Sequence, residues 1–204
     1  FNFRDNFLCK KIKSYFDDGN NYFEIQLNEK GFLNGVSKEW YPNGQVKFTE
    51  SYLNNKCHGD FKNYDENGQI IYHLVFNKGD LLEDKIKIWY PNGQIKVNGL
   101  NSKWYPNGQK KQEGSNSWYS NGKPERVYEN GILIWYHENG KKFLETNPMN
   151  QSGTKKIMNY YNEKGDLIQE STEDGFREFY DNGNISVEIC EICGGGPAGI
   201  KKIY

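Results

Sequence analysis

Apolar and polar residues alternate along the chain after a set of regularly placed glycines. The alternating apolar positions are Val46, Phe48 and Tyr52, then Ile70, Tyr72, Leu74 and Phe76, then Ile95 and Val97, and finally Ile185, Val187 and Ile189. A period of two is typical of a β-strand with one face buried. The pattern therefore predicts a strand after each of these glycines. It weakens at residues 110–112 and 124–126, where we expect the thinnest part of the molecule.

The glycines themselves recur through nearly the whole chain and define nine units. They are Gly19, Gly44, Gly68, Gly93, Gly108, Gly122, Gly140, Gly165 and Gly183. The steps between them are 25, 24, 25, 15, 14, 18, 25 and 18 residues. The six residues WYPNGQ occur twice, beginning at Trp89 and Trp104. We interpret each unit as a β-hairpin with a fixed turn at the glycine and a return loop of variable length.

The residues around the glycine predict the type of turn. Asn-Gly usually marks a two-residue loop, but Pro42, Pro91 and Pro106 directly precede the Asn. Proline fits the second position of a type I turn, with the glycine following in the left-handed region as a bulge. The stretches YDENG, YHENG and YNEKG, beginning at Tyr64, Tyr136 and Tyr161, are one residue longer and predict a four-residue loop.

Aromatic residues fill two adjacent positions before the turn. The five tryptophans immediately precede the turn tyrosine, and the other units carry Tyr15, Asn63, Tyr160 and Phe179 at that place; the tryptophans are Trp40, Trp89, Trp104, Trp118 and Trp135. The next position is aromatic in every unit. Neighbouring strand residues point to opposite faces, so we expect two aromatic ladders, one on each side of the sheet.

Composition supports an all-β chain without a charged binding tract. Alanine occurs once, at Ala198, while 22 glycines and 16% aromatic residues favour strands and tight turns over helix. The net charge of −1 comes from 26 basic and 27 acidic residues that are spread along the chain, which argues against a nucleic-acid partner. A run of about 18 apolar residues, as a membrane-spanning helix needs, does not occur.

Candidate chemistry is sparse. The GGGPAG stretch matches a dinucleotide fingerprint at Gly194, Gly196 and Gly199, but too few residues follow for the required helix, so we interpret it as part of a flexible terminal segment. Cys190 and Cys193 form a C-x-x-C pair, for which inert cysteines, a redox dithiol or disulfide, and zinc stay open in that order. Cys9 and Cys57 are expected to be inert. No nucleophile motif or convergent carboxylate pair stands out, so we predict no catalytic residues, no metal site and no cofactor.

The repeated units resemble the bacterial variant of the MORN repeat. The resemblance rests on units such as YPNGQVKFTESYLNNKCHGDFKNYDENGQI, WYPNGQIK, WYPNGQKK and FYDNGNIS, and extends from about residue 15 to 190. It implies an elongated, open and twisted antiparallel array of β-hairpins in a single sheet. We therefore expect one repeat domain of nine hairpins over residues 1–190 and a flexible segment over residues 191–204. The resemblance also slightly favours an exported or envelope protein over a cytoplasmic one.

The same resemblance implies a non-catalytic scaffold that binds another protein. Kinases that carry MORN repeats have nucleotide-binding and catalytic motifs that this chain lacks. The alternatives are a carbohydrate-binding or envelope-surface protein, and an antitoxin or immunity partner of a toxin; a glycan or a lipid headgroup is the alternative ligand. Exposed aromatic rings suit protein and sugar surfaces, whereas cross-strand pairing would make the ladders purely structural. The candidate binding stripe comprises Trp40, Trp89, Trp104, Trp118, Trp135 and Tyr160.

Overall fold

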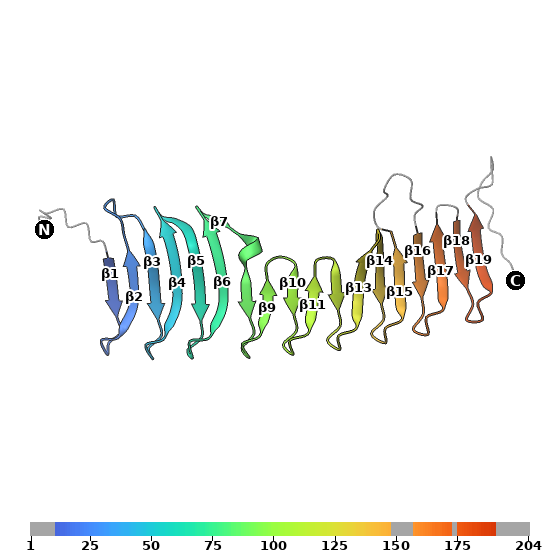
Figure 1. Ribbon diagram of the computed structural model, residues 1–204, viewed down its shortest axis with the longest axis horizontal. Helices are drawn as coiled ribbons and strands as arrows, with labels where there is room; N and C mark the ends of the chain where they lie inside the picture. Colours follow the sequence, from blue (N-terminus) through green and yellow to red (C-terminus); the bar gives the residue numbers. More distant parts are fainter. Residues whose placement is uncertain (1–10, 148–156, 173–174, 191–204) are drawn as a thin grey trace, which may run out of the picture. The chain divides into compact units, whose positions relative to one another are not determined.

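The computed structural model describes residues 11–147, 157–172 and 175–190. Within these residues the chain forms 19 β-strands and one short 3-10 helix, η1 (Glu83–Lys85), and it contains no α-helix (Figure 1). The chain divides into two compact units, Phe1–Gly108 and Gln109–Tyr204. The predicted all-β class is confirmed. The expected flexible segment at residues 191–204, with Cys193 and the glycine fingerprint, lies outside the described residues, as does Cys9.

The strands are short and follow one another closely. The first unit contains β1 (Lys11–Tyr15), β2 (Asn21–Gln26), β3 (Gly35–Trp40), β4 (Val46–Leu53), β5 (Lys56–Tyr64), β6 (Ile70–Asn77), β7 (Asp80–Leu81), β8 (Lys87–Trp89), β9 (Ile95–Asn98) and β10 (Ser102–Trp104). The second contains β11 (Lys110–Glu113), β12 (Asn116–Trp118), β13 (Pro124–Glu129), β14 (Ile132–Tyr136), β15 (Lys142–Thr146), β16 (Ile157–Tyr161), β17 (Leu167–Thr172), β18 (Gly175–Phe179) and β19 (Ile185–Cys190). Strands β8 to β12 have three or four residues each. The weak pattern at residues 110–112 falls in this stretch, whereas β13, which contains residues 124–126, has six residues, so the second predicted thin region is wrong.

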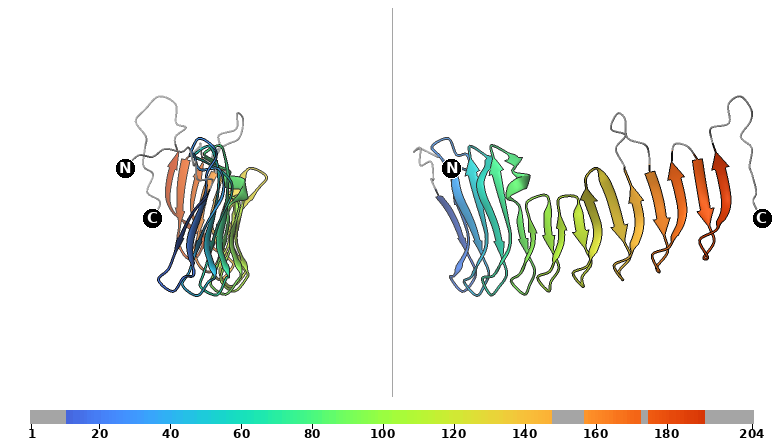
Figure 2. Two further views of the ribbon diagram at one scale, coloured as in Figure 1. Left: turned by 90° about the vertical axis from the view of Figure 1, so that its left-hand side faces the viewer. Right: turned by 45° about the vertical axis from the view of Figure 1, so that its right-hand side comes forward.

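Each unit is an antiparallel sheet in which sequence neighbours pair. In the first unit every strand from β1 to β6 pairs with the next, β6 also pairs with β8, and β8, β9 and β10 continue in order. In the second unit every strand from β11 to β18 pairs with the next. Each unit is a single layer (Figure 2). A side chain on either face is therefore covered only by its neighbours in the same sheet.

The nine predicted turns share one geometry. In each, the glycine amide donates to the carbonyl oxygen three residues earlier, as Gly44 does to Tyr41 at 2.9 Å. All nine glycines have φ between 82° and 92°, and the Tyr41 amide donates to the carbonyl of Gln45. This is the type I turn with a glycine bulge that the proline predicted. Return loops use Asn54–Asn55, Lys78–Gly79 and Asn130–Gly131, where all six residues have positive φ.

The four-residue loops predicted after Tyr64, Tyr136 and Tyr161 are wrong. There the residue that takes the place of Tyr41 is Asp65, His137 or Asn162, and each makes the same turn hydrogen bonds. The aromatic residue in these units therefore stands one position earlier than we aligned it. Counted from the turn glycine, the fourth residue back is aromatic in all nine units: Tyr15, Trp40, Tyr64, Trp89, Trp104, Trp118, Tyr136, Tyr161 and Phe179.

A second irregularity follows each turn and changes which side chains share a face. Trp40 is in register with Val46, whereas the preceding Glu39 is in register with Phe48, so the register shifts by one. The same shift occurs at Asn63/Tyr64, Ile88/Trp89, Ser117/Trp118, Trp135/Tyr136, Tyr160/Tyr161 and Glu178/Phe179. Adjacent residues of a strand face opposite ways, so Val46 and Phe48 lie on opposite faces. Simple alternation had placed them on one face.

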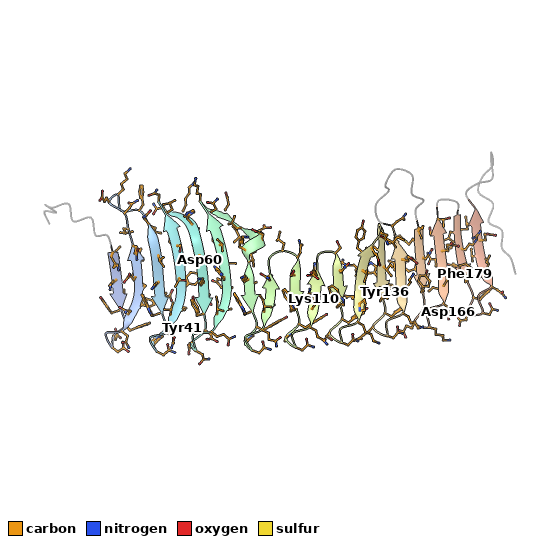
Figure 3. The ribbon with its side chains drawn as sticks, in the orientation of Figure 1. Tyr41, Asp60, Lys110, Tyr136, Asp166 and Phe179 are labelled. Atoms are coloured by element: carbon orange, nitrogen blue, oxygen red, sulfur yellow. The ribbon has the colours of Figure 1, made fainter. Side chains whose placement is uncertain are left out.

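Side chains at the turns connect successive hairpin repeats. The hydroxyl of Tyr41 donates to the carbonyl oxygen of Tyr64 at 2.9 Å, and Tyr90 and Tyr119 make the same bond to Trp104 and Tyr136. The amides of Asn43, Asn92 and Asn139 donate to the carbonyls of Glu66, Pro106 and Glu163. Figure 3 shows Tyr41 at this edge of the first unit. We call these bonds the turn ladder.

We expect Tyr41→Phe to lower the free energy of unfolding by about 1 kcal/mol, because it removes one half-buried hydrogen bond and leaves the ring in place. Urea unfolding followed by circular dichroism measures the change. Tyr180→Phe is the control, because Tyr180 occupies the same turn position in the last unit and is 55% exposed. Equal losses in the two variants would show that the ladder contributes nothing specific.

The described residues contain little deeply buried apolar surface. Phe61, 7% exposed, is the one large hydrophobic residue among them that is classed as buried. Its ring centroid lies 4.7 Å from that of Phe76, 5.6 Å from Tyr52 and 6.4 Å from Phe48. The core of the first unit is therefore this cluster on one face of β4, β5 and β6. The expectation of one domain over residues 1–190 stays a prediction.

Candidate functional site

The first unit has two chemically different faces. One face carries the Phe61 cluster together with Phe23, because Phe23, Glu39 and Phe48 are in register across β2, β3 and β4. We call it the phenylalanine face. The other carries the aromatic residues four positions before the turn glycines, and we call it the tryptophan face. Its residues alternate along one row across successive strands: Trp40, Val46, Tyr64, Ile70, Trp89 and Ile95.

This row explains why each unit carries an aromatic residue at that position. Neighbouring strands lie about 4.8 Å apart, so rings on alternate strands are about 10 Å apart and an aliphatic side chain fills each interval. Cross-strand pairs of aromatic and β-branched residues stabilise sheets by about 0.2–1 kcal/mol each. The tryptophans of the row are half-buried and keep part of each ring accessible. The row both holds the hairpins together and forms a surface.

The structure does not bring all six residues of the predicted stripe together. Trp40, Trp89 and Trp104 in the first unit and Trp118 in the second share the position four before the glycine. In the second unit, however, one row runs in register across β12 to β16 and consists of Ser117, Arg126, Trp135, Leu144 and Tyr160. Trp135 and Tyr160 therefore face away from Trp118. The Arg126 guanidinium lies 5.1 Å from the Trp135 ring centroid, which covers that ring.

A row of lysines runs beside the tryptophan row in the first unit. Eight residues follow one another in register across β1 to β6, β8 and β9, and every second one is a lysine: Lys13, Glu24, Lys38, Thr49, Lys62, His73, Lys87 and Asn98. The four lysines, which we call the lysine row, each stand two residues before an aromatic residue and so share its face. They are about 24 residues apart in the chain. The fold converts scattered charges into a basic stripe next to half-buried aromatic rings.

The four lysines of the row differ in whether a carboxylate lies next to them. Glu24 is held by Lys11 at 2.7 Å and Lys13 at 3.2 Å, and these partners lower the pKa of its carboxyl. Asp60 accepts from His73 Nε2 at 2.7 Å and lies 3.4 Å from Lys62 Nζ. Lys38 and Lys87 are exposed. The positive charge of the row is therefore most available at these two residues.

Asp60 supplies a pH-dependent contact at this face (Figure 3). The hydrogen bond from His73 lowers the pKa of Asp60 below its ordinary value, with a smaller contribution from Lys62. A lowered carboxyl pKa adds stability that is present above the unfolded value and is lost as pH falls through the folded one. We expect Asp60→Asn to flatten the fall in stability between about pH 4 and pH 2. Urea midpoints across that range measure this; a wild-type-like pH profile would contradict it.

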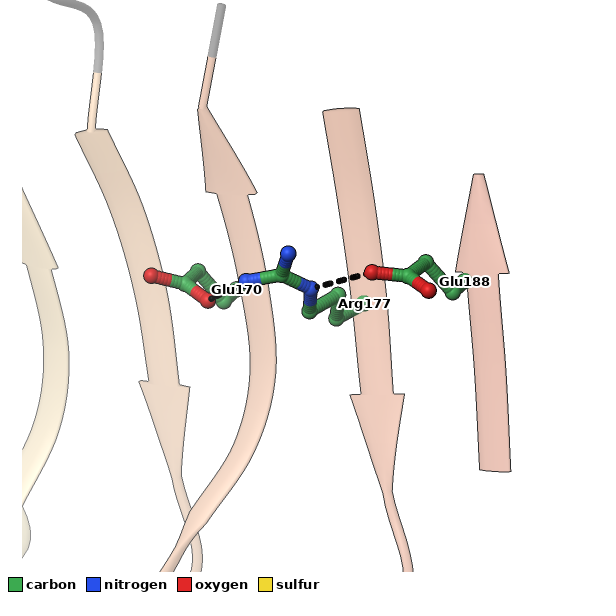
Figure 4. A network of polar contacts seen from close by, with 3 residues as sticks. All are labelled: Glu170, Arg177 and Glu188. Carbon is green, nitrogen blue, oxygen red and sulfur yellow. Dashed lines mark hydrogen bonds and ion pairs between the residues drawn. The ribbon is translucent and has the colours of Figure 1, made fainter. Parts of the chain in front are cut away.

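The corresponding row in the second unit is acidic. Ile134, Glu145, Asn159, Glu170, Arg177 and Glu188 follow one another in register across β14 to β19. Arg177 Nε donates to Glu188 at 2.8 Å, and Nη1 lies 3.4 Å from Glu170 (Figure 4). Glu145 accepts from the Tyr161 hydroxyl and lies 3.1 Å from Lys142. These carboxylates are compensated by neighbours, which separates this row from the lysine row.

Metal-binding groups and free thiols bear on what chemistry the described residues could support. No cluster of three or more His, Cys, Asp or Glu side chains able to hold a metal ion occurs among them. Cys57 is a free, half-buried thiol. Within the same residues no helix is both long and apolar enough to cross a membrane. Cys190 closes β19, whereas its C-x-x-C partner Cys193 falls outside the described residues.

Sequence reasoning missed the lysine row and the turn ladder, although both left a signal. The stretches KSY, KEW, KNY and KIW end at Tyr15, Trp40, Tyr64 and Trp89, and place a lysine two residues before each aromatic. The asparagine directly before the glycine was interpreted only as a turn former. Its side chain also reaches the next unit. Counting the columns within each unit back from the glycine, instead of from the aromatic pair, would have shown the lysine column.

An open antiparallel sheet built from tandem hairpins with a shared turn defines a β-repeat protein. Comparison with known families gives four matches to the MORN repeat variant, at residues 33–54, 58–78, 97–115 and 129–147. The chain therefore contains MORN repeats of this variant type. Such repeats are generally interaction modules for protein or membrane surfaces and are generally non-catalytic. None of the curated proteins searched matches the chain.

Proposed function

We propose that this protein is a non-catalytic scaffold that binds another protein through the tryptophan face of its first unit. The observation that supports the proposal is the pairing of half-buried aromatic rings with the lysine row on one face. Aromatic residues are enriched at protein interfaces, where they contribute large contact area. A single layer supplies an extended surface of this kind.

The partner surface that fits this face is acidic at its rim and apolar at its centre. Lys38 and Lys87 meet the rim, and Trp40, Tyr64 and Trp89 meet the centre. Of the predicted stripe, the proposed surface on the first unit thus keeps Trp40, Trp89 and Trp104. Electrostatic complementarity of this kind raises association rates and selects the partner. A carbohydrate-binding or antitoxin role would use the same rings.

Site-specific photocrosslinking in the producing cells tests the proposal. We expect a photoreactive phenylalanine at Lys38 or Lys87 to give one discrete protein adduct, and the same residue at Glu66 to give none. Glu66 is an exposed turn residue that does not belong to the tryptophan row. The partner identified by mass spectrometry is then purified and titrated. Trp89→Ala should weaken its binding at least tenfold, which corresponds to a loss of about 1.4 kcal/mol.

Two outcomes would overturn the proposal. One is adduct formation at Glu66 equal to that at Lys38, which would indicate nonspecific contact. The other is a saturable change of tryptophan fluorescence with oligosaccharides in the absence of a protein adduct, which would favour the carbohydrate alternative. A single stoichiometric toxin as the adduct would place the protein among antitoxins and keep the assigned face.

A further inference from the structure

A hollow of about 250 Å³ lies on the phenylalanine face of the first unit, over β2, β3 and β4. Its lining includes Phe23, Ile25, Ser37, Glu39, Phe48 and Glu50. This volume is below that of most pockets for cofactors or drug-sized ligands, which begin near 300 Å³. The hollow therefore suits a single side chain. Glu24 and, from the lysine row, Lys38 also border the hollow, but Ser37, Glu39 and Glu50 lie on the face opposite the tryptophan row, so this site differs from that of the proposed function.

Two substitutions in the repeat pattern create the hollow. Ser37 stands seven residues before its turn glycine, Gly44, and Phe61 takes the same place before Gly68 in the next hairpin repeat. Glu50 stands six residues after the same glycine, where the units on either side carry Ile25 and Leu74. Ser37 and Glu50 are directly in register across β3 and β4. A small polar residue and an acid thus replace two apolar residues at one point of the phenylalanine face.

The hydroxyl of Ser37 lacks a partner at the floor of the hollow. Ser37 is 8% exposed, and its Oγ is buried with no hydrogen-bond partner. Burying a hydroxyl without a hydrogen bond is unfavourable. A bound donor that reaches Ser37 would remove this cost. The orphaned hydroxyl is therefore an observation, separate from the carboxylates, that points to a ligand.

The charges around the floor select a cation. Glu50 accepts one hydrogen bond, from the Tyr52 hydroxyl at 2.7 Å, and a carboxylate has capacity for several more. Burial and the neighbouring Glu50 raise the pKa of Tyr52, which keeps its hydroxyl protonated as a donor. Glu39 already binds the chain's own Lys47 at 2.6 Å on this face. Phe23 and Phe48 flank Glu39 in register and offer ring faces to a cation.

We propose that this hollow binds the ammonium or guanidinium end of a lysine or arginine side chain presented by a partner polypeptide. The charged end donates to Glu50 and to the Ser37 hydroxyl, and the methylene stem lies between Phe23 and Phe48. Long basic side chains commonly bury their stems on apolar surface in this way. The hollow thereby supplies one basic-residue-specific contact on the phenylalanine face.

Nuclear magnetic resonance titration of the full chain with N-acetyl-lysine N-methylamide tests this. We expect saturable shifts of the Ser37, Phe48 and Glu50 amides with a dissociation constant in the millimolar range, as suits one isolated side chain. The uncharged isostere N-acetyl-norleucine N-methylamide should bind at least fivefold more weakly. Glu50→Gln should weaken lysine binding at least fivefold, and Glu188→Gln, in the second unit, should leave it unchanged.

A filling variant separates binding from folding. Ser37→Phe restores the residue type of the neighbouring unit, so it should abolish lysine binding while the melting temperature stays equal to or above that of the wild type. The proposal is overturned if norleucine binds as well as lysine, if Glu50→Gln retains full binding, or if no shift occurs up to 50 mM ligand. Loss of the tryptophan-face adduct in the crosslinking experiment would leave these results untouched.

Discussion

Replacing Phe61 by alanine should lower the free energy of unfolding by about 3 kcal/mol, the largest loss that we expect from one substitution. Phe61 is 7% exposed, and its ring contacts Phe48, Tyr52 and Phe76 from three strands. Removing it takes the centre out of the only ring cluster of this size that the described residues contain. Urea unfolding monitored by circular dichroism measures the loss.

Phe32→Ala is the matched control for that substitution. Phe32 has the same side chain in the same unit, but it lies in a loop and is 41% exposed. We expect this variant to lose less than about 1 kcal/mol, as exposed substitutions do. Equal losses in the two variants would show that the phenylalanine cluster is not the core of the first unit.

Replacing Gly44 by valine should cost about 2 kcal/mol through the backbone alone. Gly44 has φ of 85°, a region that is unfavourable for residues with a Cβ and most unfavourable for β-branched ones. Apart from its chain neighbours, no heavy atom lies within 4 Å of the position that a Cβ would take, so the added Cβ meets open space. The loss measured by urea unfolding would therefore report the left-handed turn that all nine units share.

Gly44→Asn serves as the control at the same site. Asparagine visits the left-handed region more readily than other residues, and the chain already uses it there at Asn54, Asn55 and Asn130. We expect this variant to lose less than about 1 kcal/mol. A valine variant as stable as the asparagine variant would contradict the assigned turn type.

The turn type could be predicted from sequence because it depends on neighbouring residues. Pro42 fixes φ at the second turn position, and Gly44 accepts positive φ, so Tyr41–Gly44 carries its own information. The fold class followed for the same reason, since strands and turns repeat the same short-range pattern nine times. Local chemistry of this kind does not depend on the rest of the chain.

The assignment of faces failed where it depended on register. Trp135 and Tyr160 were placed with Trp118 because each precedes a tyrosine, yet the turn begins one residue later in their units. The shift between Glu39 and Trp40 inserts one further residue, and alternation alone does not reveal it. Because the side-chain period in a strand is two, an error of one residue moves a side chain to the other face.

The candidate sites could not be predicted from the sequence for a related reason. Lys38 and Lys62 are 24 residues apart in the chain, so their charges form a stripe only after the hairpins stack in register. The hollow arises from what Ser37 lacks relative to Phe61, and this comparison needs the correct alignment of units. Both features can be predicted once the aromatic positions of each repeat are also counted from its turn glycine.

The most direct test of the repeat architecture is to remove one repeat seamlessly. Deleting residues 94–108 joins Gly93 to Gln109 and recreates WYPNGQ, because the sequence around Trp104 duplicates that around Trp89. The variant lacks β9 and β10. The control deletes residues 94–109, one residue more, and so shifts the following strand by one position.

Thermal unfolding followed by circular dichroism compares the two deletions. We predict that the 15-residue deletion keeps the β-sheet spectrum per residue and unfolds cooperatively, because each hairpin contacts mainly its neighbours. The 16-residue deletion should lose stability, since a shift of one residue moves side chains to the wrong face. An unfolded 15-residue deletion, or equal stability of the two variants, would contradict an architecture built from interchangeable, register-matched hairpins.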